Sequence, residues 1–210
     1  MSHDISARVI VTGNSDKNWD TMPTLPPTVV LWLCQNSTIT NPLVYTLPLG
    51  LENLKHGRSG IKSHHKECEG HRIEDRVFVP PMLNTNPIRP ITIESTLLRP
   101  DTFDTFLDYL AAEKYFALAE RYRFVLCLEG NGHENHRLWE TLYHGNFPVM
   151  LRSPWQESLG YLNLPILSVD SVDDISPNLL RTFHGANSNF SPAETACLWL
   201  NYWERMIDEA

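Results

Sequence analysis

The sequence predicts an α/β protein in which helices cover both faces of a parallel sheet, as in Rossmann-like folds. Short apolar runs recur along the 210-residue chain, and from about residue 76 they alternate with helical patterns. Such alternation is typical of β-α-β units, whose strands run parallel. The run from Val29 to Cys34 is apolar at nearly every position, as expected for a strand buried on both faces. A hydrophobic fraction of 42% allows a core that needs no disulfides.

The N-terminal part contains three short apolar runs that predict strands, at residues 8–12, 29–34 and 43–47. The first ends in the polar loop GNSD, and the third is followed by a Pro-Leu-Gly turn. Residues 52–75 are polar and rich in histidine, as in a surface helix or a loop between two halves. We therefore expect a reduced α/β half over residues 1–75 and a second domain over residues 76–210.

The second domain begins with an apolar strand near Arg76. The cluster NTNPIRP predicts a turn, because Pro87 and Pro90 cannot pair regularly. Asp101 then begins a helical pattern that extends to Tyr122. The elements expected after it are a strand at 123–128, a helix at 136–145, a strand at 147–152, a strand with a following loop at 164–175, and a last helix capped by Ser191.

The composition argues against several classes of partner and compartment. The formal net charge is -8, whereas binding to a nucleic-acid backbone requires a basic face. No apolar run approaches the roughly 20 residues of a membrane helix, and the N-terminus lacks a signal-peptide pattern. The four cysteines form no CxxC motif, and Cys34 and Cys127 lie in apolar runs, as buried free thiols do. We expect a cytoplasmic protein without a transmembrane segment or a nucleic-acid partner.

The segment from Cys127 to Pro148 carries the strongest functional signal. A buried strand brings the chain to the carboxyl edge of the sheet, where open α/β sheets bind their ligands. Gly130 and Gly132 allow a sharp turn and a close approach of the backbone to a ligand. The helix that begins near Asn135 offers free N–H groups and a positive dipole end, which favour a diphosphate.

Two side chains on this helix suit a nucleotide. Arg137 lies in the first turn and can form bidentate phosphate contacts. Glu140 is three residues further along, on the same face, where a carboxylate can accept hydrogen bonds from ribose hydroxyls. The same spacing also fits a plain loop followed by a surface pair of Arg137 and Glu140. The motif is neither GxGxxG nor a Walker A loop, so both interpretations remain open at this point.

The segment EGNGHENHRLWETLYHGNFPVM resembles the nucleotide-sugar signature of exostosin-like and α-1,3-fucosyltransferase-like glycosyltransferases of the GT-B type. Those families have a strand, a polar Gly/Asn loop, a helix with a basic-Leu-x-acidic pattern, a Gly, and an x-Pro-Val/Ile strand. Looser similarities follow the same order in TGNSD, LCQN…LPLGLEN and MLNTNPIRP, and the closing LPIL and LNYWERMI also fit. The chain is shorter than the two-domain enzymes. The resemblance therefore implies a GT-B-type donor domain with a reduced acceptor half.

The resemblance also implies an activity: transfer of a sugar from a nucleotide-diphosphate sugar donor to a glycan or other hydroxyl acceptor, without a metal or cofactor. The alternative is a non-catalytic nucleotide-sugar-binding module or a partner subunit of a larger transferase. Arg137 would contact the diphosphate and Glu140 the ribose. The other implied substrate-binding residues are Asn14, Asn86, Arg89, Glu129, Gly130, Asn131, Gly132 and His136.

An inverting transfer requires a general base near the acceptor hydroxyl. Asp16 follows the first strand and would face the cleft from the other half, although an Asx turn also explains an aspartate there. His133 and His136 are the competing candidates, and His133 would also line the pocket for the sugar or phosphate.

Three patterns carry residue types that bind metals, but none is a complete motif. His64, His65, Cys68 and His71 have zinc-like spacings without a second Cys pair, and a solvated loop or helix fits them better. The stretch HENH lacks HExxH spacing, so the two histidines do not share a helix face. VDSVDD lacks DxD spacing, and its last two aspartates fit a helix start. We expect no metal.

Overall fold

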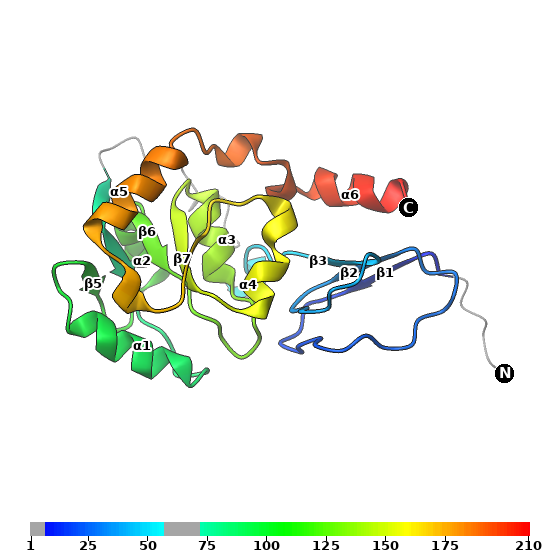
Figure 1. Cartoon of the computed structure of the whole chain (residues 1–210), viewed down its shortest axis with the longest axis horizontal. Helices are drawn as coiled ribbons and strands as arrows, with labels where there is room; N and C mark the ends of the chain where they lie inside the picture. The colour runs from blue at the N-terminus through cyan, green and yellow to red at the C-terminus, as the bar shows by residue number, and fades with distance from the viewer. Residues whose placement is uncertain (1–6, 57–71) are drawn as a thin grey trace.

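The computed structural model describes residues 7–56 and 72–210, and within these ranges it holds two β-sheets (Figure 1). The smaller sheet has the order β1-β2-β3 and the larger one the order β5-β4-β6-β7-β8. All neighbouring strands pair in parallel, which confirms the predicted α/β class with parallel sheets. The strands are β1 (Val9–Thr12), β2 (Leu31–Cys34), β3 (Val44–Thr46), β4 (Ile73–Val79), β5 (Phe103–Thr105), β6 (Tyr122–Leu126), β7 (Phe147–Leu151) and β8 (Leu167–Val169).

Both faces of the larger sheet are buried. Successive residues of a strand point to opposite faces; in β6, Phe124 belongs to one core cluster and Val125 to the other. Helices α3 and α4 pack on the Val125 side, and α5 packs on the Phe124 side. No helix in the described stretches is long and apolar enough to cross a bilayer. The helices are α1 (Ile88–Leu97), α2 (Ala112–Ala119), α3 (His136–Tyr143), α4 (Pro154–Ser158), α5 (Pro177–Ala186) and α6 (Leu200–Asp208).

The structure adds a helix where the sequence predicts only a turn. Helix α1 begins at Ile88, inside the NTNPIRP cluster. Pro87 occupies its N-cap and Pro90 lies in its first turn, where a missing N–H breaks no helical hydrogen bond. The two prolines therefore start a helix here instead of preventing regular structure.

The helix predicted from Asp101 to Tyr122 is wrong over its first part. Phe103 is the first residue of β5, where it pairs with Val77 and is 2% exposed. Helical structure begins only at Ala112, and Tyr122 already lies in β6. Apolar residues at i, i+3 and i+4 also occur in a short strand and loop that pack on a sheet. Pairing with β4 therefore decides the structure, and local periodicity does not.

The C-terminal helix also starts later than the sequence predicts. Ser191 makes no side-chain cap, and two 3₁₀ turns follow it before α6 begins at Leu200. Helix α6 then runs back alongside the smaller sheet (Figure 1). Arg8 Nη2 donates a hydrogen bond to the Ala210 carbonyl, 2.5 Å away, and Trp203 is buried. The end of the chain thus packs against its beginning.

The strand order of the larger sheet reverses at β4. The chain leaves β4 to form β5 on one side, and it later returns to form β6 on the other side. The loops that follow these strands diverge at the carboxyl edge, and such a switch point is where open α/β sheets bind ligands.

The carboxyl ends of the two sheets face each other, and the loop after β6 lies between them. Three contacts join this loop to the segments that follow β1, β2 and β3. His133 Nε2 lies 3.1 Å from Asp20 Oδ1, the Glu134 amide donates to Asn36 Oδ1, and the Leu49 amide donates to Glu134 Oε1.

Candidate functional site

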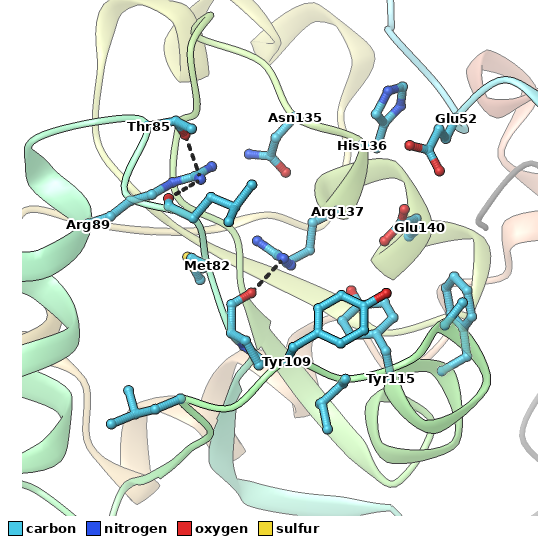
Figure 2. A pocket seen from close by; sticks show the side chains of 16 residues that line it. Glu52, Met82, Thr85, Arg89, Tyr109, Tyr115, Asn135, His136, Arg137 and Glu140 are labelled. Carbon is cyan, nitrogen blue, oxygen red and sulfur yellow. Dashed lines mark hydrogen bonds between the residues drawn. The ribbon is translucent and has the colours of Figure 1, made fainter. Parts of the chain in front are cut away.

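A pocket of about 520 Å³ lies at the switch point of the larger sheet (Figure 2). Such a volume is typical of small-molecule sites. The loops after β4, β5 and β6 all contribute to it, and Glu52 adds a carboxylate from the segment after β3. Four of the residues implied by the family resemblance line this pocket: Arg89, His136, Arg137 and Glu140.

Arg89 is a buried cation that ties two loops together. Its Nε donates to the Glu129 carbonyl at 2.7 Å and its Nη2 to the Leu128 carbonyl at 3.2 Å. Its Nη1 donates to the Leu83 carbonyl and to Thr85 Oγ1, both at 2.8 Å. A guanidinium has five N–H donors, and one on Nη2 has no partner among the described residues. Arg89 therefore offers the pocket its charge and a single hydrogen bond.

Arg137 approaches the pocket from the first turn of α3. Its Nη2 donates to the Pro81 carbonyl at 3.3 Å, and its guanidinium lies 5.9 Å from the centre of the Tyr115 ring. Its Nε is buried and has no hydrogen-bond partner among the described residues. Burial alone would lower the pKa of Arg137, but Tyr115, Cys127 and Glu140 raise it above its ordinary value, which keeps the group charged.

The two guanidinium groups act on each other. Burial and, to a smaller extent, the charge of Arg137 together lower the pKa of Arg89 to about 10. An ion pair requires a nitrogen-to-oxygen distance of at most 4.0 Å, and no carboxylate oxygen of the described residues lies that close to either guanidinium group. The pocket thus holds two neighbouring cations that form no ion pair with a described residue, and the carboxylates of Glu52 and Glu140 line it as well. An anion bound between them would relieve their repulsion.

His136 has a defined tautomer. Its Nδ1 lies 2.8 Å from the Gly50 carbonyl oxygen, which can only accept a hydrogen bond. The proton of the neutral ring is therefore on Nδ1, and the lone pair is on Nε2. His136 and Glu52 lie close together in the view of Figure 2, above Glu140.

Asn135 gives α3 its position. Its Oδ1 accepts a hydrogen bond from the Leu138 amide at 3.1 Å, which is an N-cap, and its Nδ2 donates to the Leu128 carbonyl at 2.9 Å. The cap holds the first turn of α3 against the end of β6. This orients the side chains of His136 and Arg137 toward the pocket.

The other predicted site residues lie outside the pocket, and most join the two sheets. Asn131 Nδ2 donates to Asp16 Oδ2 at 3.2 Å. The His133 ring lies between Asp20 and Glu129, with Nδ1 3.3 Å from Glu129 Oε2. We call this contact between residues 16–20 and residues 129–134 the inter-sheet interface.

Asn14 and Asn86 have structural partners. Asn14 has a φ of 57°, and its backbone N–H donates a hydrogen bond to Gln35 Oε1, as in a tight turn after β1. Asn86 Oδ1 accepts from the Ile88 amide at the start of α1, and its Nδ2 donates to the Gly130 carbonyl at 3.2 Å. Neither side chain reaches the pocket.

The two glycines permit close packing within the chain. A Cβ on Gly130 would lie 3.1 Å from Arg89 Nη2, and one on Gly132 would lie 2.8 Å from Asn36 Oδ1. The loop after β6, expected to approach a ligand, thus packs against Arg89 on one side and the smaller sheet on the other. Of the segment after β6, only Asn135, at the end of the loop, and side chains of α3 line the pocket.

Several residues of the pocket and interface were missed by sequence reasoning. Tyr109 and Tyr115 come from the segment predicted as one helix, and Glu52 comes from a polar stretch without periodicity. Glu134 is buried, although it sits in a run of polar residues. Local sequence carries no signal for them, because their positions depend on the packing of distant segments.

The metal patterns remain without support. The described residues contain no cluster of three or more His, Cys, Asp or Glu side chains suited to a metal ion. The zinc-like pattern of His64, His65, Cys68 and His71 lies outside the described residues. Asp173 and Asp174 belong to a 3₁₀ turn that Ser171 caps.

Comparisons with known proteins leave the fold and the pocket as the basis for assigning a function. No family model matches the chain, and no curated protein sequence is significantly similar to it.

Proposed function

We propose that this chain is a metal-independent glycosyltransferase that binds a nucleotide-diphosphate sugar in the switch-point pocket and transfers the sugar to a hydroxyl acceptor. The observation that carries the proposal is the pair of neighbouring guanidinium groups, Arg89 and Arg137, without a paired carboxylate among the described residues. A diphosphate is the ligand group that best matches two cations at the carboxyl edge of a parallel sheet.

The two arginines have different roles in this proposal. Arg137 has a buried Nε without a described partner and supplies hydrogen bonds to the diphosphate. Arg89 is held by carbonyl oxygens and supplies mainly a fixed charge. Fixed charges that need no rearrangement stabilise the negative charge that develops on a departing diphosphate. Glu140 lines the same pocket and accepts hydrogen bonds from the ribose hydroxyls.

We assign the general base to His136 in preference to Asp16 and His133. Asp16 and His133 do not line the pocket, and both are engaged in the inter-sheet interface. His136 Nε2 takes the proton of the acceptor hydroxyl while the acceptor oxygen bonds to the anomeric carbon. The bond from that carbon to the diphosphate oxygen breaks, and its electron pair leaves with the diphosphate.

Binding of nucleoside diphosphates and their sugars, measured by isothermal titration calorimetry, tests the proposal. We expect Arg137→Gln to weaken binding about tenfold to a hundredfold, because hydrogen bonds to charged groups contribute about 1.5–3 kcal/mol. Arg152→Gln is the matched control, since Arg152 pairs with Asp170 and does not line the pocket. Equal affinities for the wild type and Arg137→Gln would exclude the diphosphate site.

Turnover distinguishes an enzyme from a binding module. One observation favours a binding module over an enzyme: Asp16 and His133, two candidates for the general base, form their contacts outside the pocket. For an enzyme, we expect His136→Gln to lower kcat about 10²- to 10⁴-fold with an unchanged Kd for the donor. Donor binding without transfer or hydrolysis over a broad acceptor panel would favour the module.

The same proposal includes a reducing compartment such as the cytoplasm. The thiols of Cys34, Cys127 and Cys197 are free and buried in the structure. Burial raises the pKa of Cys127 to about 12, so this thiol is inert and packs as a small apolar side chain.

A further inference from the structure

The rim of the switch-point pocket is unusually apolar for an exposed surface. Leu83 is 79% exposed, Leu107 is 62% exposed and Tyr109 is 75% exposed, and all three line this pocket. Leu83 lies on the loop after β4, and the other two lie on the loop after β5. Single exposed apolar side chains are common, but three that line the same pocket indicate a binding surface.

The pocket has a charged and polar wall on one side and an apolar rim on another. Helix α3 supplies the charged and polar wall, with His136, Arg137 and Glu140. The loops after β4 and β5 supply the apolar rim. In Figure 2 the Tyr109 ring lies below Arg137, whereas His136 lies on the opposite side of Arg137. A ligand that fills the pocket therefore has an anionic and hydroxylated part and a part with an apolar face.

We infer that the rim of Leu83, Leu107 and Tyr109 binds the nucleobase of the donor by stacking, with little discrimination between bases. This inference rests on the proposed function. With the diphosphate at Arg137 and the sugar on the His136 side, the base extends toward Tyr109. A planar ring suits an open rim with an exposed aromatic side chain, because every base has a π-face that stacks on it.

The rim offers few groups that could distinguish bases. The side chains of Leu83, Leu107 and the neighbouring Leu110 carry no hydrogen-bonding atom, and Tyr109 offers one hydroxyl. Strong discrimination arises where buried polar groups would be left unpaired by the wrong ligand. An exposed apolar rim does not impose that penalty, so uracil, adenine and guanine should bind with similar affinity.

The experiment compares UDP, ADP, GDP and inorganic pyrophosphate by isothermal titration calorimetry. We expect Kd values for the three nucleotides within about tenfold of each other. Tyr109→Ala should weaken all three about tenfold or more, the effect of losing one stacking partner, and should leave pyrophosphate unchanged. Tyr109→Phe keeps the ring and should bind as the wild type does. Tyr109 is largely exposed, so these variants should fold normally.

Each result separates this inference from the proposed function. If nucleotides bind, Arg137→Gln weakens them and Tyr109→Ala does not, the stacking rim is wrong and the donor site stands. A preference above about a hundredfold for one base would overturn readout by stacking alone. If no nucleotide binds, both proposals fail together.

Discussion

The backbone amide of Leu49 donates a hydrogen bond to the side chain of Glu134, with 2.5 Å between Leu49 N and Glu134 Oε1. This contact joins the segment after β3 to the loop after β6, and thus the smaller sheet to the larger one. The same oxygen accepts a hydrogen bond from Trp139 Nε1 at 2.6 Å, and Oε2 is buried without a described partner. Burial raises the pKa of Glu134 to about 8, against the effect of these hydrogen bonds.

This raised pKa predicts a pH-dependent stability. Between pH 4.5, the ordinary value, and about pH 8, the folded protein keeps a proton on Glu134 that the unfolded chain loses. The contribution of Glu134 to the free energy of unfolding is therefore complete below pH 4.5. It is lost as the pH rises to about 8. The slope is at most about 1.4 kcal/mol per pH unit.

The Glu134→Gln variant should flatten this profile, because its amide oxygen still accepts both hydrogen bonds and does not titrate. Urea denaturation at several pH values between about 5 and 8 measures the slope for each variant. Glu157→Gln, at an exposed position in α4, is the control and should keep the wild-type slope. If Glu134→Gln and the wild type have the same slope between about pH 5 and 8, Glu134 is ionised in the folded protein over this range.

The histidine in the inter-sheet interface predicts a local effect. Carboxylates only accept hydrogen bonds, so His133 can donate to both Asp20 and Glu129 only when both ring nitrogens carry protons. The hydrogen bond from His133, followed by that from Thr38, lowers the pKa of Asp20. The contribution of Asp20 to stability is therefore present above its ordinary pKa and is lost as the pH falls through the lowered value.

Asp20→Asn should loosen residues 16–20 without unfolding the protein. We expect faster hydrogen exchange at the Trp19 amide, which donates to the Asn36 carbonyl at 2.9 Å, with a change in global stability of about 1 kcal/mol or less. Asp170→Asn breaks a comparable exposed pair with Arg152 and serves as the control. Unchanged exchange in this segment would mean that Asp20 does not hold it.

Arg89 should matter for folding more than Arg137 does. Lysine keeps the charge but cannot reach the carbonyls of Leu83, Leu128 and Glu129 together, which leaves buried acceptors unsatisfied. We expect Arg89→Lys to lower the free energy of unfolding by about 2–4 kcal/mol. Chemical denaturation measures it, with Arg152→Lys as the exposed control. Wild-type stability in Arg89→Lys would refute this structural role.

The close approach of Gly132 to Asn36 gives a paired test of the contact between the loop after β6 and the segment after β2. A Cβ at Gly132 would displace the Asn36 amide, which accepts from the Glu134 amide at 2.7 Å and donates to the Ser15 carbonyl at 2.9 Å. We expect Gly132→Ala to destabilise the protein by about 1–3 kcal/mol. Gly160→Ala adds the same methyl group where no atom lies within 4 Å, so its melting temperature should not fall. Equal melting temperatures for the two variants would contradict this packing.

The parts of the fold that could be predicted are those with a local signal. The continuous apolar runs in β2, β6 and β7 identified strands that are buried on both faces. Asn135 and Gly145 marked the ends of α3; Gly145 has a φ of 70°, which glycine adopts at little cost. Where strand pairing opposed local periodicity, as at Phe103, the prediction failed because the helical spacing belonged to a strand and a loop.

The candidate site divides in the same way. The sequence by itself determined that Arg137 and Glu140 share a helix that starts at the carboxyl edge of a parallel sheet, since spacing within one helix is a local property. The family resemblance implied Arg89 as well, but only the tertiary structure decided that Tyr109 joins them, and that His133 and Asp16 serve the inter-sheet interface instead of the pocket. These contacts join residues up to 115 positions apart. Such pairs form only when two sheets dock, and no local pattern encodes the geometry of that docking.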